Sequence, residues 1–220
     1  MIVKVCGMRD AENIRAVEQT GADWMGFIFF EGSPRYVSEV PEHLPDDCAR
    51  VGVFVDAKLV DIIRKVNEYG LQYVQLHGNE KPDNCRTLQK AGVKVIKAFN
   101  LAKQEDLNHV GRYDGVCDYY LFDTATPDHG GSGEGFDWRL LRNYHGRTPF
   151  LLSGGLGLDS LGQLSRFRHP RWAGVDLNSR FEIEPGLKDA DQIEEFILQF
   201  KQLTYQYHEQ NKRTFRPKAQ

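Results

Sequence analysis

The stretch IVKVCGMRDAENIRAVEQTGADWMGFIF, residues 2–29, contains one complete copy of the pattern that decides the fold. A short β-branched run, residues 2–6, precedes a helical segment that ends at Gly21, a residue type that commonly closes helices. A second apolar run begins at Trp24. Residues 2–29 therefore predict a strand, a helix and a second strand, and two strands joined by a helical crossover are normally parallel.

The same pattern recurs along the chain. Eight short apolar, β-branched or aromatic runs start 21 to 31 residues apart, which is the length of a strand, a helix and two loops. They are residues 2–6, 24–29, 50–55, 73–76, 94–98, 118–122, 149–153 and 173–177. Eight such units in 220 residues predict a compact (β/α)8 TIM barrel of the α/β class. A doubly wound open sheet is the alternative, but the first strand-to-helix turn, VCGMRD, lacks the glycine fingerprint of dinucleotide-binding folds.

Composition indicates one globular domain. Of the 220 residues, 40% are hydrophobic, and no linker-like stretch divides the chain. We predict a catalytic barrel domain over residues 1–208, whose last helix carries an apolar stripe from Ile193 to Tyr207. Residues 209–220 are predicted to form a polar, basic and flexible tail.

Charge and cysteine spacing restrict the partners. The net charge of −3, without a basic stripe in the body of the chain, argues against nucleic acid and anionic membranes as partners. There is no signal-peptide pattern and no run of about 18 apolar residues, so we expect a cytoplasmic protein. We expect a monomer or a homodimer. The four cysteines are too far apart in the sequence for zinc-site or CxxC spacing, so we expect reduced thiols and no metal.

The first strand ends on a cysteine. In a (β/α)8 barrel, functional residues lie at the C-terminal ends of the strands. Alternation directs Cys6 and Lys4 into the barrel, whereas Val3 and Val5 face the helices. A free cysteine is commonly just a small buried hydrophobic residue. Here a following helix N-terminus and the lysine on the same face are expected to lower the thiol pKa from about 8.5 toward neutrality, as a general base requires.

The sixth strand ends on a carboxyl group at the same barrel mouth. Asp123 follows the apolar run YYLF, whose burial would favour the protonated form. Asp123 and Cys6 therefore suggest a general acid and a general base, with a loop-capping aspartate as the alternative for Asp123. Glycine-bearing loops follow strands seven and eight, where barrels often bind phosphate, so we expect a small phosphorylated molecule as substrate. Residues 129–138, HGGSGEGFDW, predict either a mobile lid or a flexible glycine linker.

Several motifs occur in a specific combination. The chain contains, in order, the stretches KVCGMR, GFIFFEGSPRYV, QLHGNE, LFDT, GGSGEGFDW, SGGL and PGLKD. Together they resemble the phosphoribosylanthranilate isomerase family of tryptophan biosynthesis over nearly the whole chain. The resemblance implies an Amadori rearrangement of an N-linked ribose 5-phosphate, with no cofactor and no metal. It also implies that Asp123 is the general acid and Cys6 the general base.

The resemblance further implies the substrate contacts. Arg35 would bind the anthranilate carboxylate through its planar guanidinium. The other residues that match the family's site are Gly154, Gly155, Asn178 and Ser179 for phosphate, and His77 and Asp176 in less defined roles. Asp176 and Lys4 lie on strands that neighbour each other in barrel order, and we predict a buried ion pair between them.

One loop departs from the family pattern. The family commonly has serine-glycine, a small aliphatic residue and glutamate after strand eight, whereas this chain reads NSRFE, with Arg180 and Phe181. Arg180 would either crowd the phosphate or add a charged donor. The sequence does not indicate what Glu134 does in the predicted lid.

Two rival functions remain. One is another sugar-phosphate isomerase, such as the related histidine-pathway isomerase; that enzyme uses paired aspartates, so the inward Cys6 disfavours it. The other is a catalytically silent phosphate-binding barrel with an interaction or regulatory role.

Overall fold

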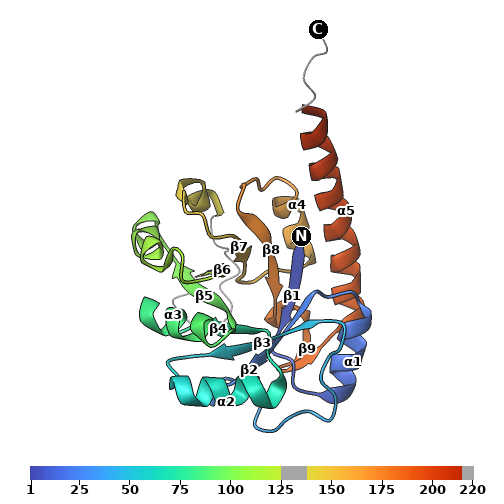
Figure 1. The fold of residues 1–220 in the computed structure, drawn as a ribbon. Helices are drawn as coiled ribbons and strands as arrows, with labels where there is room; N and C mark the ends of the chain where they lie inside the picture. Colours follow the sequence, from blue (N-terminus) through green and yellow to red (C-terminus); the bar gives the residue numbers. More distant parts are fainter. Residues whose placement is uncertain (125–137, 215–220) are drawn as a thin grey trace.

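The computed structural model describes residues 1–124 and 138–214, which form a barrel of strands surrounded by helices (Figure 1). Eight parallel strands pair in chain order, and β1 pairs with β8, so the sheet is closed. The strands are Ile2–Cys6 (β1), Trp24–Ile28 (β2), Ala49–Phe54 (β3), Tyr73–Leu76 (β4), Lys94–Leu101 (β5), Tyr119–Thr124 (β6), Phe150–Leu152 (β7) and Trp172–Leu177 (β8). Closure confirms the (β/α)8 barrel and excludes the open sheet.

Helices follow β1, β3 and β4 as predicted, and each has a local cause. Asp10 begins α1 (Ala11–Gln19) by accepting a backbone hydrogen bond of the first turn. Gly70 ends α2 (Leu59–Tyr69) in the left-handed conformation, with φ of 58°. A proline occupies the first position of α3 (Pro82–Lys90), where its fixed φ suits a helix start.

Other connections are less regular. Residues 29–48, between β2 and β3, contain no helix although the strand spacing predicts one. Pro34, Pro41 and Pro45 explain the difference, because each removes a backbone donor that a helix needs. Short elements occupy the later connections: η1 (Gln104–Tyr113), η2 (Trp138–Asn143), η3 (Leu158–Ser160), α4 (Leu161–Leu164), η4 (Ser179–Phe181), and a hairpin of β9 (Glu182–Glu184) and β10 (Leu187–Lys188).

The last helix, α5 (Ala190–Thr214), runs along the outside of the barrel and extends past it (Figure 1). Its predicted apolar stripe is buried from Ile193 to Phe200. No helix in the described part of the chain is both long and apolar enough to cross a membrane. The division into a domain of residues 1–208 and a tail stays a prediction, as does the cytoplasmic location.

Strand alternation produces two separate cores. Val3 and Val5 of β1 belong to the layer between barrel and helices, together with Ile14 of α1. Lys4 and Cys6 therefore face the barrel interior, as predicted. The second core consists of strand residues alone and fills that interior: Trp24, Val51, Tyr73, Ile96, Ala98, Leu121 and Leu151.

Closure of the barrel depends on a glycine in β8. Gly174 pairs with Ile2, and a Cβ at Gly174 would lie 2.0 Å from the Ile2 carbonyl oxygen. Because that neighbour is backbone, we expect Gly174→Ala to reduce the free energy of unfolding by about 1–3 kcal/mol or more. The measurement is urea unfolding, with Gly162→Ala as control, since a Cβ at Gly162 would meet nothing within 4 Å. Equal unfolding midpoints for the two variants would contradict this account of closure.

Candidate active site

The thiol of Cys6 lies inside the barrel at the end of β1, and 3% of the residue is exposed. Its register partner is Gly26 of β2. A Cβ at Gly26 would lie 2.7 Å from Sγ of Cys6 and 3.2 Å from Nζ of Lys4. Gly26 therefore provides the space that the thiol and the ammonium share. The sequence analysis missed this role, because only the strand register reveals it.

Lys4 and Asp176 form the predicted ion pair. Nζ of Lys4 lies 2.7 Å from Oδ1 of Asp176, and both side chains are buried. The other carboxylate oxygen of Asp176 accepts a hydrogen bond from the hydroxyl of Ser153 at 3.1 Å. Both oxygens of Asp176 are thus engaged by protein groups. Its predicted contact with substrate stays a prediction.

The pKa of Cys6 differs from the expectation. Burial raises the pKa of the thiol, and the negative charge of Asp176 acts in the same direction. The ammonium groups of Lys4 and Lys188 oppose this rise without overcoming it. The expected pKa near neutrality is therefore wrong for the ligand-free site. Cys6 is a thiol at neutral pH, with two cations nearby that would stabilise its thiolate.

Asp123, at the end of β6, lies beside His77, which follows β4. Nε2 of His77 is 3.5 Å from Oδ2 of Asp123, and the two side chains are 27% and 23% exposed. Buried Gln75 contacts the other ring nitrogen, Nδ1, through its Nε2 at 3.0 Å. With Nδ1 as acceptor, Nε2 carries the ring proton and faces the carboxylate. The structure thus brings together the predicted general acid and His77, and it adds Gln75, which sequence analysis missed.

A second buried ion pair holds the loop that carries His77. Nζ of Lys97 lies 3.3 Å from Oε2 of Glu80, and the two side chains are 3% and 2% exposed. The same ammonium donates to the carbonyl oxygens of Leu76 and Gly78, at 3.2 and 2.8 Å. A lysine in the apolar run KVIKA was the available signal, because a buried charge needs a partner.

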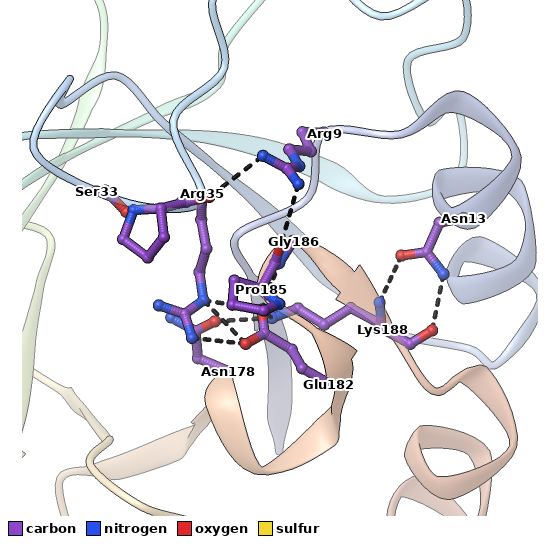
Figure 2. A network of polar contacts seen from close by, with 10 residues as sticks. Arg9, Asn13, Ser33, Arg35, Asn178, Glu182, Pro185, Gly186 and Lys188 are labelled. Carbon is purple, nitrogen blue, oxygen red and sulfur yellow. Dashed lines mark hydrogen bonds and ion pairs between the residues drawn. The ribbon is translucent and has the colours of Figure 1, made fainter. Parts of the chain in front are cut away.

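Arg35 comes from the loop after β2, and its guanidinium forms a bidentate ion pair with Glu182 (Figure 2). Nε donates to Oε1 at 2.8 Å and Nη2 donates to Oε2 at 2.6 Å. Nη1 has no hydrogen-bond partner within the described part of the chain. Glu182 was missed by the sequence analysis because it lies 147 residues from Arg35.

The residues predicted to bind phosphate lie at the ends of β7 and β8, which are paired strands. Gly154 and Gly155 have φ values of 86° and 63°, a conformation that other residues rarely adopt. Asn178 precedes η4, which begins at Ser179. The side-chain oxygen of Asn178 accepts a hydrogen bond from Nζ of Lys188 at 2.7 Å. The two strand ends are therefore neighbours, which a shared phosphate site requires.

Arg180 lies over the glycine loop that follows β7. Its Nη2 pairs with Asp159 at 2.9 Å, and its Nη1 is 3.5 Å from the carbonyl oxygen of Gly155. Arg180 thus lies beside the predicted phosphate loop with its charge paired to Asp159, and whether it crowds the phosphate or donates to it stays a prediction. Residues 129–137 of the predicted lid, with Glu134, lie outside the described residues.

Comparisons with known proteins give concordant results. A family model described as N-(5'-phosphoribosyl)anthranilate (PRA) isomerase matches residues 3–199. The N-(5'-phosphoribosyl)anthranilate isomerase of Phocaeicola vulgatus is 57% identical over 202 residues, covering 92% of this chain and 98% of that protein. The phosphoribosyl anthranilate isomerase structure from Thermotoga maritima is 36% identical with a TM-score of 0.81, covering 91% of this chain and 99% of that one.

A further solved phosphoribosyl anthranilate isomerase was crystallised in complex with reduced 1-(o-carboxyphenylamino)-1-deoxyribulose 5-phosphate. It is 32% identical with a TM-score of 0.78, and the match covers 91% of this chain and 99% of that one. The family match runs from β1 into α5, and the relatives are matched over almost their entire length. The chain therefore belongs to the N-(5'-phosphoribosyl)anthranilate isomerase family.

Proposed function

We propose that this chain catalyses the Amadori rearrangement of N-(5'-phosphoribosyl)anthranilate to 1-(2-carboxyphenylamino)-1-deoxyribulose 5-phosphate, a step of tryptophan biosynthesis. One observation carries the proposal. In a barrel of this family, an inward thiol ends β1 and a carboxyl group beside a histidine ends β6. The rearrangement adds a proton to the ring oxygen and removes one from C2, so it needs an acid and a base.

Asp123 acts as the general acid in the first step. It donates a proton to the ribose ring oxygen while the bond from that oxygen to C1 breaks. The electron pair of the anthranilate nitrogen forms the C1–N double bond of a protonated Schiff base. Nε2 of His77, 3.5 Å from Oδ2 of Asp123, faces the carboxylate that remains after this proton transfer.

Cys6 acts as the general base in the second step. Its thiolate takes the proton from C2, the C–H electron pair forms a C1–C2 double bond, and the Schiff-base electrons return to nitrogen. The resulting enol becomes the ketone when its hydroxyl proton leaves and C1 is protonated. The cations of Lys4 and Lys188 favour the thiolate that this step requires. Asp176 contributes by holding Lys4.

Two contacts orient the substrate. The unoccupied edge of the Arg35 guanidinium, with Nη1, binds the ring carboxylate. Backbone N–H groups of the two loops that begin with Gly154 and Asn178 bind the phosphate. The substrate then extends from the β1–β2 side of the mouth to the β7–β8 side.

The deciding experiment follows the fluorescence decay of freshly generated phosphoribosylanthranilate after addition of the purified protein. Turnover that requires the protein would support the proposal. No turnover by folded protein, with retained binding of inorganic phosphate, would instead favour a silent phosphate-binding barrel. Turnover of a different aminoaldose alone would favour another sugar-phosphate isomerase.

The raised pKa of Cys6 predicts the pH dependence of the base step. Asp123→Asn has no general acid that titrates, so its residual kcat/KM follows the thiolate fraction of the free enzyme and is expected to rise about tenfold per pH unit between about pH 6 and 8. The cause is burial of the thiol, which raises its pKa and leaves a small thiolate fraction at neutral pH. Initial rates of this variant in buffers of constant ionic strength measure the profile. A plateau below pH 7 in this variant would contradict the raised pKa.

A further inference from the structure

The hairpin of β9 and β10 is tied to two other parts of the barrel mouth (Figure 2). Asn13 of α1 donates from Nδ2 to the carbonyl of Lys188 and accepts from its backbone N–H, both at 2.8 Å. Arg9 donates to the carbonyl oxygens of Pro34 and Pro185, at 3.2 and 3.0 Å. The hairpin, α1 and the loop that carries Arg35 are thus held together by side-chain contacts to backbone.

Glu182 is the centre of this assembly. Besides the bidentate pair with Arg35, its Oε1 accepts a hydrogen bond from Nζ of Lys188 at 2.6 Å and one from the backbone N–H of Gly186 at 3.0 Å. The side chain of Glu182 is 5% exposed and that of Lys188 is fully buried. Burial alone would raise the pKa of Glu182, but the hydrogen bonds from Arg35 and Lys188 lower it to about 2. Glu182 is therefore charged throughout the working pH range.

The assembly lies directly against the residue that follows Cys6. Gly7 has φ of 84°, and a Cβ there would be 2.7 Å from Cδ of Arg35, 3.0 Å from Oδ1 of Asn178 and 3.4 Å from Nζ of Lys188. A shift of the Arg35 side chain would therefore change the packing around Gly7, next to the reacting thiol of Cys6. Arg35 also retains its Nη1 edge, because Glu182 occupies only the edge formed by Nε and Nη2.

We propose that Glu182, held by Lys188, is a positioning residue that presents the free edge of Arg35 to the ring carboxylate and so makes the enzyme selective for an aminoaldose with a carboxylate beside the amine. The cations of Arg35 and Lys188 and the anion of Glu182 sum to a net charge of +1, which the single carboxylate of the substrate ring balances. The inference rests on the proposed function. It adds Glu182 and Lys188 to the residues that determine the preference for a ring carboxylate, and it names the fixed orientation of Arg35 as the cause. Without Glu182, the long arginine side chain would lose its fixed orientation.

The test compares inhibition by two compounds that differ only in the ring carboxylate. One is the reduced product, which carries the benzoate, and the other is the matching anilino compound. Glu182→Gln is expected to weaken binding of the benzoate compound about tenfold or more and that of the anilino compound less than about threefold. Glu184→Gln, an exposed change in the same hairpin, is the control and should leave both constants unchanged.

A second variant separates positioning from folding. Lys188→Met combined with Glu182→Gln removes the cation that the single change leaves buried, and it is expected to show the same loss of selectivity. The ratio of the two inhibition constants does not depend on the folded fraction, since both are measured on one sample. In an Arg35→Lys background, Glu182→Gln should have little further effect on that ratio.

Each remaining outcome counts against the inference. If Glu182→Gln weakened the binding of both compounds equally, Glu182 would have a purely structural role. If it tightened the binding of the benzoate compound, removing the negative charge of Glu182 would matter more than the orientation of Arg35. Either result, in an enzyme that still turns over phosphoribosylanthranilate, would overturn the inference alone. Absence of turnover by the unmodified protein would overturn the proposed function itself.

Discussion

Cys6→Ser is expected to lower kcat/KM for phosphoribosylanthranilate by about 10²- to 10⁴-fold. Serine has nearly the shape of cysteine, so the barrel interior keeps its packing. Its hydroxyl, however, is far less acidic than a thiol, and the nearby Lys4 cannot generate an alkoxide there. The change therefore removes the base while retaining the fold. Fluorescence-detected initial rates give the activity, and circular dichroism verifies folding.

The matched control is Cys48→Ser. Cys48 is buried as well, but its thiol donates to the carbonyl oxygen of Ala22 at 3.0 Å, away from the strand ends that form the site. We expect its activity to be unchanged. Asp123→Asn should lose activity over the same range as Cys6→Ser, because an amide cannot protonate the ring oxygen. If folded Cys6→Ser retained activity within about threefold of wild type, Cys6 would be a small buried core residue and not the general base.

Lys4→Met is expected to reduce the free energy of unfolding by about 3–5 kcal/mol, because it leaves the carboxylate of Asp176 buried without its cation. Only 5% of that side chain is exposed, so water cannot replace the lost partner. Asp176→Asn should cost a similar amount for the converse reason. Urea unfolding followed by circular dichroism measures both changes.

The double variant, Lys4→Met with Asp176→Asn, isolates the cause. Because the double variant leaves neither charge buried, its free energy of unfolding should be higher than that of either single variant, even though it carries one more substitution than each of them. Lys90→Met, an exposed change in α3, is the control and should alter stability by less than about 0.5 kcal/mol. Additive losses in the double variant would show that Lys4 and Asp176 act independently.

The pair also has a defined pH range. Burial alone would lower the pKa of Lys4, but attraction to Asp176 outweighs it and raises the pKa above the ordinary 10.5. A group whose folded pKa is raised contributes its full stabilisation below the unfolded pKa and loses it as pH rises through the folded value. The stability gap between wild type and Lys4→Met should therefore persist from neutral pH up to about pH 10 and shrink at higher pH.

Periodicity in the sequence was sufficient for the fold. The spacing of apolar runs predicted the closed barrel, and alternation along β1 placed Lys4 and Cys6 inside it. Barrel order makes Lys4 and Asp176 neighbours, so the sequence predicts their ion pair. These inferences succeeded because strand alternation and parallel pairing are set by local backbone geometry, which repeats at fixed intervals along the chain.

The sequence by itself thus determined the barrel, the inward Cys6 and the presence of Asp123 at a strand end. The tertiary structure alone decided that Glu182 clamps Arg35, that Gln75 contacts His77 and that burial keeps the pKa of Cys6 high. These three features depend on how deeply each side chain is buried and on which loop residue it contacts. Those quantities arise from contacts between distant segments, and no local pattern in the chain encodes them.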